Sequence, residues 1–294
     1  MTPEAEADPP SSAPDPERPL GGELPHPART ARWGPWRAQP SKGPARRLKL
    51  LLLHGFAGAP GEMRPLGKAM LGRRFRVHAP LLPGHGENLD GMREIRLDDW
   101  LEAATLSYEG LRRDGSPVAI VGFCLGGALA LRLAGSLNPR AICCLSTPVR
   151  PLPEGAFPLV DPELRSTANS VLDSPSAEVR RWRELGSHKL VPLSFHAQYQ
   201  NLLRELEGSL DEVRCPLLVA QSRGDGITPP EDAEILVEAV RSERRKLVWS
   251  RHAGHALPVD VGRRALFAEL ASFLEAEDQA ASSPFSSRQA TPTE

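Results

Sequence analysis

The sequence lacks the segments that would direct a chain into or across a membrane. Residues 1–30 contain neither the basic region nor the apolar stretch of a secretory signal. No run of apolar residues is long enough to span a bilayer. We therefore expect a cytoplasmic protein without stable membrane insertion.

The chain also lacks an excess of charge and most of the patterns that bind cofactors. Its formal net charge is −1 and no basic stripe is present, so we expect no nucleic-acid partner. The phosphate-binding pattern G-x-x-x-x-G-K-[ST] and the metal-binding pair C-x-x-C are both absent. We therefore expect neither a metal nor another cofactor, and the oligomeric state stays open.

Cysteine is scarce, whereas proline is abundant and unevenly placed. The four cysteines include the adjacent pair Cys143 and Cys144 inside an apolar run, which favours buried free thiols over disulfides. Many of the thirty prolines lie between residues 3 and 44. We expect residues 1–44 to form a disordered tail, in which Trp33 and Trp36 are the residues most suited to pack against the domain. Residues 277–294 are also polar, and we expect them to be disordered.

Between these tails, over residues 45–276, short apolar strands alternate with helical patterns. The predicted strands are residues 48–55, 75–80, 118–123, 141–146, 216–221 and 246–250. The predicted helices are residues 61–71, 97–113, 125–137 and 261–275. This alternation predicts one α/β domain with a mostly parallel central sheet flanked by helices.

The segment of roughly residues 147–213 interrupts this alternation. It begins with a cluster of prolines and continues with stretches rich in charge and leucine. We expect it to form a cap over the carboxyl ends of the strands, where open α/β sheets bind ligands. Its apolar residues are either the wall of a pocket or, as is more common, ordinary packing: Leu190, Val191, Leu193, Phe195, Tyr199 and Leu203.

The motif V-G-F-C-L-G-G at 121–127 lies between a predicted strand and a predicted helix. A G-x-S-x-G motif in that setting is a nucleophile elbow, and here Cys124 stands at the serine position. Gly122, Gly126 and Gly127 would let the strand and helix approach closely. The positive end of the helix would favour the thiolate of Cys124. The alternative is a buried core cysteine.

A nucleophile of this kind needs a base and an acidic residue that orients it, each following a later strand. Asp225 follows the strand 216–221 in S-R-G-D-G-I-T-P-P, and H-A-G-H-A-L follows the strand 246–250. We predict His255 as the base and Asp225 as its orienting acid. His252 is interpreted as structural or as a rim residue, and Asp225 alone could be a simple turn residue.

The motif H-G-F-A-G at 54–58 follows the first predicted core strand. The backbone N–H groups of Phe56 and Leu125 are the candidate oxyanion donors. We expect Gly55 and His54 to support this loop rather than to transfer protons, because the triad already supplies a base. His85, in L-P-G-H-G-E, receives no chemical role.

These motifs occur in an order that resembles the α/β-hydrolase superfamily, in particular its small bacterial carboxylesterases and monoacylglycerol-lipase-like enzymes. The resemblance spans roughly residues 47–276. It implies an α/β-hydrolase fold with a small cap inserted after the sixth core strand and a small-molecule acyl substrate. By position, the resemblance assigns the catalytic triad to Cys124, Asp225 and His255. The cysteine box also resembles those of dienelactone hydrolases and polyhydroxyalkanoate synthases.

Three functions are consistent with these residues. The first is a hydrolase that cleaves carboxylic esters, thioesters or lactones through an acyl-thioenzyme. The second is an acyltransferase that uses the same intermediate. The third is an inactive hydrolase-fold binding protein, which the matched base and orienting acid argue against.

Overall fold

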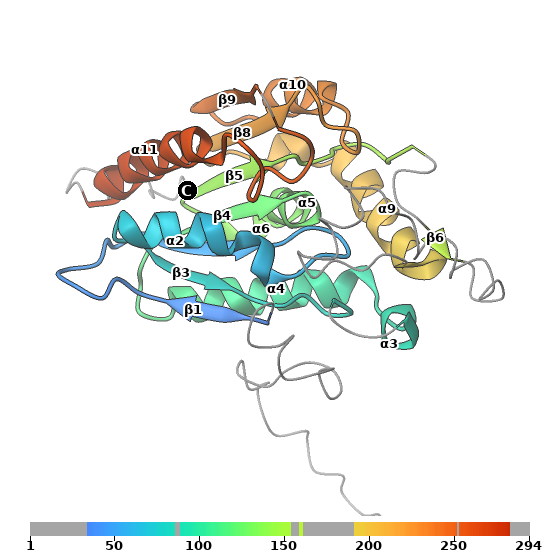
Figure 1. Ribbon diagram of the computed structural model, residues 1–294, viewed down its shortest axis with the longest axis horizontal. Coiled ribbons are helices and arrows are strands. Elements are labelled where there is room, and N and C mark those ends of the chain that lie inside the picture. Colours follow the sequence, from blue (N-terminus) through green and yellow to red (C-terminus); the bar gives the residue numbers. More distant parts are fainter. Residues whose placement is uncertain (1–33, 86–88, 154–158, 161–190, 252, 283–294) are drawn as a thin grey trace, which may run out of the picture.

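The computed structural model describes residues 34–85, 89–153, 159–160, 191–251 and 253–282. Its centre is a seven-stranded sheet in the order β1-β3-β2-β4-β5-β8-β9 (Figure 1). Strand β1 is antiparallel to β3, and all the other pairs are parallel. The predicted mostly parallel sheet is confirmed.

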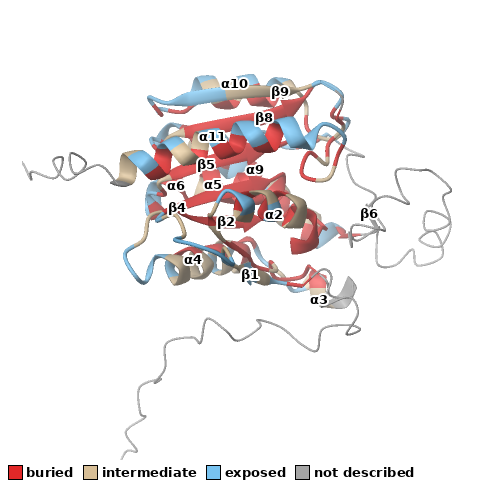
Figure 2. Ribbon diagram, turned by 60° about the vertical axis from the view of Figure 1, so that its left-hand side comes forward, coloured by how far each residue is buried: buried red, intermediate tan, exposed pale blue. Residues whose placement is uncertain are grey.

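The central strands are short and apolar because both of their faces are covered. They are β2 (Lys49–Leu53), β4 (Val118–Phe123), β5 (Ala141–Leu145) and β8 (Leu217–Ser222), in which every residue is buried. Strand β3 (Arg76–Ala79) lies next to β2. Strand β9 (Arg245–Ser250) forms an edge and carries exposed and half-buried residues (Figure 2).

Helices cover both faces of the sheet. From β2 the chain passes through α2 (Arg64–Gly72) to β3, on the side of the sheet toward β1. It then returns to the other side of β2 and adds β4, β5, β8 and β9 in that order toward the opposite edge. Right-handed crossovers therefore place α2 on the face opposite α4 (Leu97–Arg112), α5 (Leu125–Arg132) and α10 (Glu231–Ala239). Helix α11 (Arg263–Ser282) contacts α2 and so covers the first face.

The strands and helices predicted from the sequence are all present, with ends shifted by a few residues. The structure adds short elements that the patterns did not predict. These are α3 (Leu89–Arg93) and η2 (Leu210–Glu212), besides the longer α10. The predicted helix 61–71 is divided into η1 (Pro60–Met63) and α2, and the predicted helix 125–137 into α5 and α6 (Ala134–Leu137).

The N-terminal boundary of the domain lies earlier than predicted. Residues Trp36–Ala38 form β1, so the predicted disordered tail over residues 1–44 extends too far. Trp36 donates a hydrogen bond from Nε1 to the carbonyl of Pro60 at 3.2 Å and packs against Gly67, where an added Cβ would meet its ring at 2.1 Å. Trp33 lies outside the described residues. At the other end α11 continues to Ser282, past the predicted limit of residue 276.

The inserted segment leaves the sheet after β5 and returns at β8. Strand β5 is the fifth strand in chain order, so the predicted position after a sixth core strand is one strand too late. Within the described part of residues 147–213, β6 (Leu159–Val160) pairs with β7 (Val191–Pro192), and α9 (Leu193–Glu207) follows. Helix α9 contacts α5 at the end of the sheet where β4 delivers Cys124 (Figure 1).

Candidate active site

Cys124 occupies a sharp turn between β4 and α5. Its backbone has φ +52° and ψ −113°, a strained conformation for a residue with a side chain. The flanking glycines make this turn possible. A Cβ at Gly122 would lie 2.3 Å from the backbone of Gly126, and a Cβ at Gly126 would lie 2.3 Å from the carbonyl oxygen of Leu53. The predicted structural role of these two glycines is therefore explained by backbone contact.

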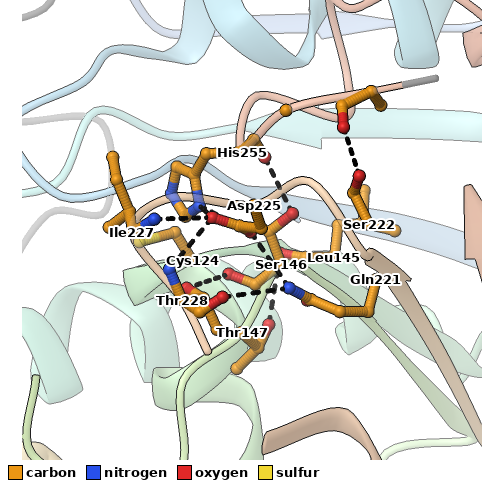
Figure 3. Close-up of polar contacts among 12 residues, drawn as sticks. Cys124, Leu145, Ser146, Thr147, Gln221, Ser222, Asp225, Ile227, Thr228 and His255 are labelled. Carbon is orange, nitrogen blue, oxygen red and sulfur yellow. Dashed lines mark hydrogen bonds and ion pairs between the residues drawn. The ribbon is translucent and has the colours of Figure 1, made fainter. Parts of the chain in front are cut away.

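Two further contacts fix the turn to the neighbouring strand. The N–H of Cys124 donates to the carbonyl of Leu145 at 2.9 Å, at the end of β5. A Cβ at Gly127 would lie 2.0 Å from Oγ1 of Thr147, so the first turn of α5 lies directly against the loop that follows β5. The side chain of Cys124 is buried and faces the group formed by Asp225 and His255 (Figure 3).

The structure brings the predicted base and orienting acid together. Nδ1 of His255 lies 3.0 Å from both carboxylate oxygens of Asp225. Oδ1 of Asp225 also accepts hydrogen bonds from the backbone N–H groups of Ile227 at 2.9 Å and Thr228 at 3.0 Å (Figure 3). Oδ2 accepts a hydrogen bond from Nε2 of Gln221 at 3.0 Å. The carboxylate is therefore held from three sides and presents its remaining edge to the imidazole.

The charges in this group stabilise one another. Burial alone would lower the pKa of His255, but the electrostatic effect of the neighbouring Cys124 and the hydrogen bond to Asp225 raise it to about 10. Burial would likewise raise the pKa of Asp225, and the hydrogen bond to His255, its positive charge and the two backbone N–H groups together lower it. The imidazole of His255 therefore keeps its proton at neutral pH beside the carboxylate of Asp225.

The H-G-F loop lies beside the nucleophile. A Cβ at Gly55 would lie 2.8 Å from the ring of Phe123 and 3.5 Å from Cβ of Cys124. This places the backbone at Phe56 next to the elbow, where Leu125 begins α5. Phe56 and Leu125 therefore both lie beside Cys124, and their role as oxyanion donors stays a prediction.

His54 holds this loop through both of its ring nitrogens. Nε2 accepts the N–H of Leu82 at 3.1 Å, so the ring proton is on Nδ1, which donates to the carbonyl of Gly55 at 3.0 Å. Burial lowers the pKa of His54 to about 4, and the ring is neutral at physiological pH. The buried carboxylate of Glu62 accepts the N–H of Gly55 at 3.3 Å. This geometry supports the loop-bracing role predicted for His54.

Several supporting residues were missed at the sequence level. Ser146, with φ +46°, donates from Oγ to the carbonyl of His255 at 2.7 Å, and Thr228 donates from Oγ1 to the carbonyl of Ser146 at 3.2 Å. These bonds tie the loop after β5 to the loops after β8 and β9. Asp225 and Ile227 have the spacing of an Asx turn, which is the one signal that the sequence offers for the conformation of this loop.

Tyr199 was considered only as a possible pocket wall, for which ordinary packing was the preferred interpretation. The structure places its hydroxyl 3.3 Å from Sγ of Cys124. Phe195 and Leu203, from the same predicted set, are buried, whereas Leu193 is exposed and Leu190 lies outside the described residues. Helical spacing alone does not separate a residue that contacts the nucleophile from one that packs in the core.

His85 is buried, and its Nδ1 lies 3.0 Å from the carbonyl of Pro83. His252 lies outside the described residues, so its predicted structural or rim role is not addressed. Among the residues that the structure describes, no three His, Cys, Asp or Glu side chains are grouped as a metal site would require. Within the same ranges, no helix has the length and apolar character needed to cross a bilayer.

Comparison with known proteins places this site in a family. Residues 50–270 match the model of the alpha/beta hydrolase family, and the chain belongs to that family. It is 26% identical to a carboxylesterase of Bacillus subtilis over 78% of this chain and 93% of the relative. It is 28% identical to a thermostable monoacylglycerol lipase of a Bacillus species over 72% of this chain and 84% of the relative.

Solved structures show the same fold. A structure reported for metagenome-derived lipolytic enzymes matches with a TM-score of 0.67 and 21% identity, covering 83% of this chain and 98% of that one. The monoacylglycerol lipase of Paleococcus ferrophilus matches with a TM-score of 0.62 and 19% identity, over 81% of this chain and 99% of that one. The predicted α/β-hydrolase fold is confirmed.

Proposed function

We propose that this protein is a hydrolase that cleaves carboxylic esters, thioesters or lactones through a Cys124-His255-Asp225 triad. The observation that carries the proposal is the 3.0 Å contact between Nδ1 of His255 and Asp225, beside a cysteine at φ +52° in a strand–helix turn. The similarity to a carboxylesterase and a monoacylglycerol lipase supports an ester as the substrate class. A cytoplasmic location stays a prediction from the sequence.

The proposed reaction proceeds in two steps. The Cys124 thiolate attacks the acyl carbon, and the backbone N–H groups of Phe56 and Leu125 stabilise the oxyanion. The imidazolium of His255 gives its proton to the departing alcohol, thiol or lactone oxygen, which leaves an acyl-thioenzyme. Water then attacks the thioester and transfers a proton to His255, and the carboxylic acid is released. Asp225 keeps Nε2 of His255 directed at the reacting groups throughout.

The test is turnover of a p-nitrophenyl ester, an acyl-CoA thioester and a lactone by the wild type and three variants. We expect Cys124→Ala and His255→Ala to lose at least about 1000-fold in kcat/KM. Cys124→Ser should retain some ester hydrolysis, because the base and oxyanion donors stay in place. Cys215→Ala is the matched control, since Cys215 is also a buried free thiol but lies outside the triad.

Two results would count against this proposal. If no substrate is turned over and iodoacetamide labels Cys124 no faster than a free model thiol, the protein is not a thiol hydrolase. If added alcohol or amine is acylated in preference to water, the same intermediate serves an acyltransferase instead.

A further inference from the structure

The cap helix α9 places a tyrosine hydroxyl directly on the nucleophile. Oη of Tyr199 lies 3.3 Å from Sγ of Cys124, within hydrogen-bonding distance for sulfur. Both side chains are buried, and they come from elements 75 residues apart in the sequence. The contact therefore depends on how the cap packs on the domain and not on the elbow alone.

Packing fixes the phenol ring independently of its hydroxyl. The ring of Tyr199 stacks on that of Phe56, with 4.8 Å between centroids and 23° between planes. Phe195, one turn earlier on α9, also stacks on the ring of Phe56, with 5.3 Å between centroids. Phenylalanine at position 199 would therefore keep the ring stacked on Phe56 and remove only the hydroxyl.

The protonation states define the direction of this hydrogen bond. Burial and the neighbouring Cys124 both raise the pKa of Tyr199 well above its ordinary value, so the phenol keeps its proton at neutral pH. In the proposed mechanism Cys124 is a thiolate and has no proton to give, so the O–H of Tyr199 is the donor of this bond. Because a C–O bond is shorter than a C–S bond, the oxygen of a serine at position 124 would lie farther from the hydroxyl of Tyr199 than the sulfur of Cys124 does. The tyrosine thus suits a sulfur nucleophile in particular.

From this geometry we infer that Tyr199 is a further catalytic residue, whose hydroxyl stabilises the Cys124 thiolate before attack and again when it leaves. This inference rests on the proposed thiol hydrolase. In deacylation, water adds to the thioester carbonyl and gives its proton to His255. The C–S bond of the adduct then breaks, its electron pair stays on sulfur, and the acid departs. The O–H of Tyr199 meets the negative charge that returns to sulfur in that step.

The test compares Tyr199→Phe with Tyr108→Phe, the variant of the one other tyrosine in the sequence. Tyr108 is also buried, on α4, and provides the matched control. The first readout is the pH profile of Cys124 alkylation by iodoacetamide. We expect Tyr199→Phe to move its midpoint upward by about one pH unit, the tenfold effect of one hydrogen bond to a charged group. Tyr108→Phe should keep the wild-type midpoint.

The second readout is the burst of p-nitrophenol and the steady rate that follows it. We expect Tyr199→Phe to slow the steady rate by roughly tenfold through deacylation. An unchanged alkylation profile in a folded Tyr199→Phe protein, checked by circular dichroism, would overturn the inference. If the profile shifts but no ester, thioester or lactone is hydrolysed by the wild type, the proposed function fails while the contact with the thiolate stands.

Discussion

Replacement of Asp225 by asparagine removes one charge and changes little else in size, so it tests the orienting role of this residue. Oδ1 of Asp225 accepts two backbone N–H groups, and the carbonyl oxygen of asparagine would keep them. The new NH2 group would then face Nε2 of Gln221 across 3.0 Å, donor against donor. Gln221 does not relieve this by turning over, because its Nε2 also donates to the carbonyl of Thr228 at 3.3 Å.

The same NH2 group would face Nδ1 of His255 and favour the tautomer that carries its proton on Nε2. That tautomer has no lone pair on Nε2 to accept the proton of the attacking water during deacylation. The variant also loses the carboxylate that helps raise the pKa of His255 to about 10. In a triad with the same roles this exchange costs about 10⁴ in kcat, or about 5 kcal/mol of transition-state stabilisation. We expect a similar loss in Asp225→Asn.

The assay is kcat/KM for a p-nitrophenyl ester, with folding of each variant checked by circular dichroism. Asp278→Asn is the matched control, because Asp278 is a buried carboxylate that accepts the N–H of Leu48 at 2.8 Å, before the start of β2 and far from the elbow. We expect Asp278→Asn to lose stability and keep its activity. A loss smaller than tenfold in Asp225→Asn would refute the orienting role.

Three further predictions concern the elbow and the oxyanion loop. Gly122→Ala places a Cβ against backbone and should lower the free energy of unfolding in urea by at least about 1–3 kcal/mol. In Gly127→Ala the new Cβ instead meets the side chain of Thr147. The double variant with Thr147→Ala should therefore recover part of the stability that Gly127→Ala loses. Equal losses of stability in the single and double variants would contradict this contact. The pKa of His54 is about 4 in the folded protein and 6.5 in the unfolded chain. As the pH falls, the unfolded chain therefore binds a proton at His54 before the folded protein does. This lowers the free energy of unfolding between pH 6.5 and pH 4. In His54→Gln the loss of stability between pH 7 and pH 4 should be smaller by roughly 3 kcal/mol, and identical acid dependence in the two proteins would show that His54 is not buried and neutral.

The features predicted from the sequence are those that local patterns encode. Strands β2, β4, β5 and β8 are continuous apolar runs because helices cover them on both faces. The order of Cys124, Asp225 and His255, each in the loop after a strand, is also a local property. Parallel strands bring such loops to one edge of the sheet, which is why three distant residues could be assigned to one site.

The features that sequence patterns missed depend on tertiary contact. Strand β1 is three residues long in a proline-rich segment and forms only because the edge of β3 is available to pair with it. Tyr199 has the helical spacing of an ordinary core residue, and only the packing of α9 on α5 brings its hydroxyl to Cys124. Ser146 supports His255 from the loop after β5 through a contact 109 residues apart, which no local motif encodes.

The most direct test of the account is to trap the acyl-enzyme. The protein is mixed with a p-nitrophenyl ester, quenched in acid during the burst, digested, and analysed by mass spectrometry. The account predicts an acyl group on the peptide that contains Cys124 in the wild type and none in Cys124→Ala. It also predicts that hydroxylamine removes this group, as expected for a thioester. Acylation of another residue, or undiminished ester hydrolysis by Cys124→Ala, would contradict the assignment of Cys124 as the nucleophile.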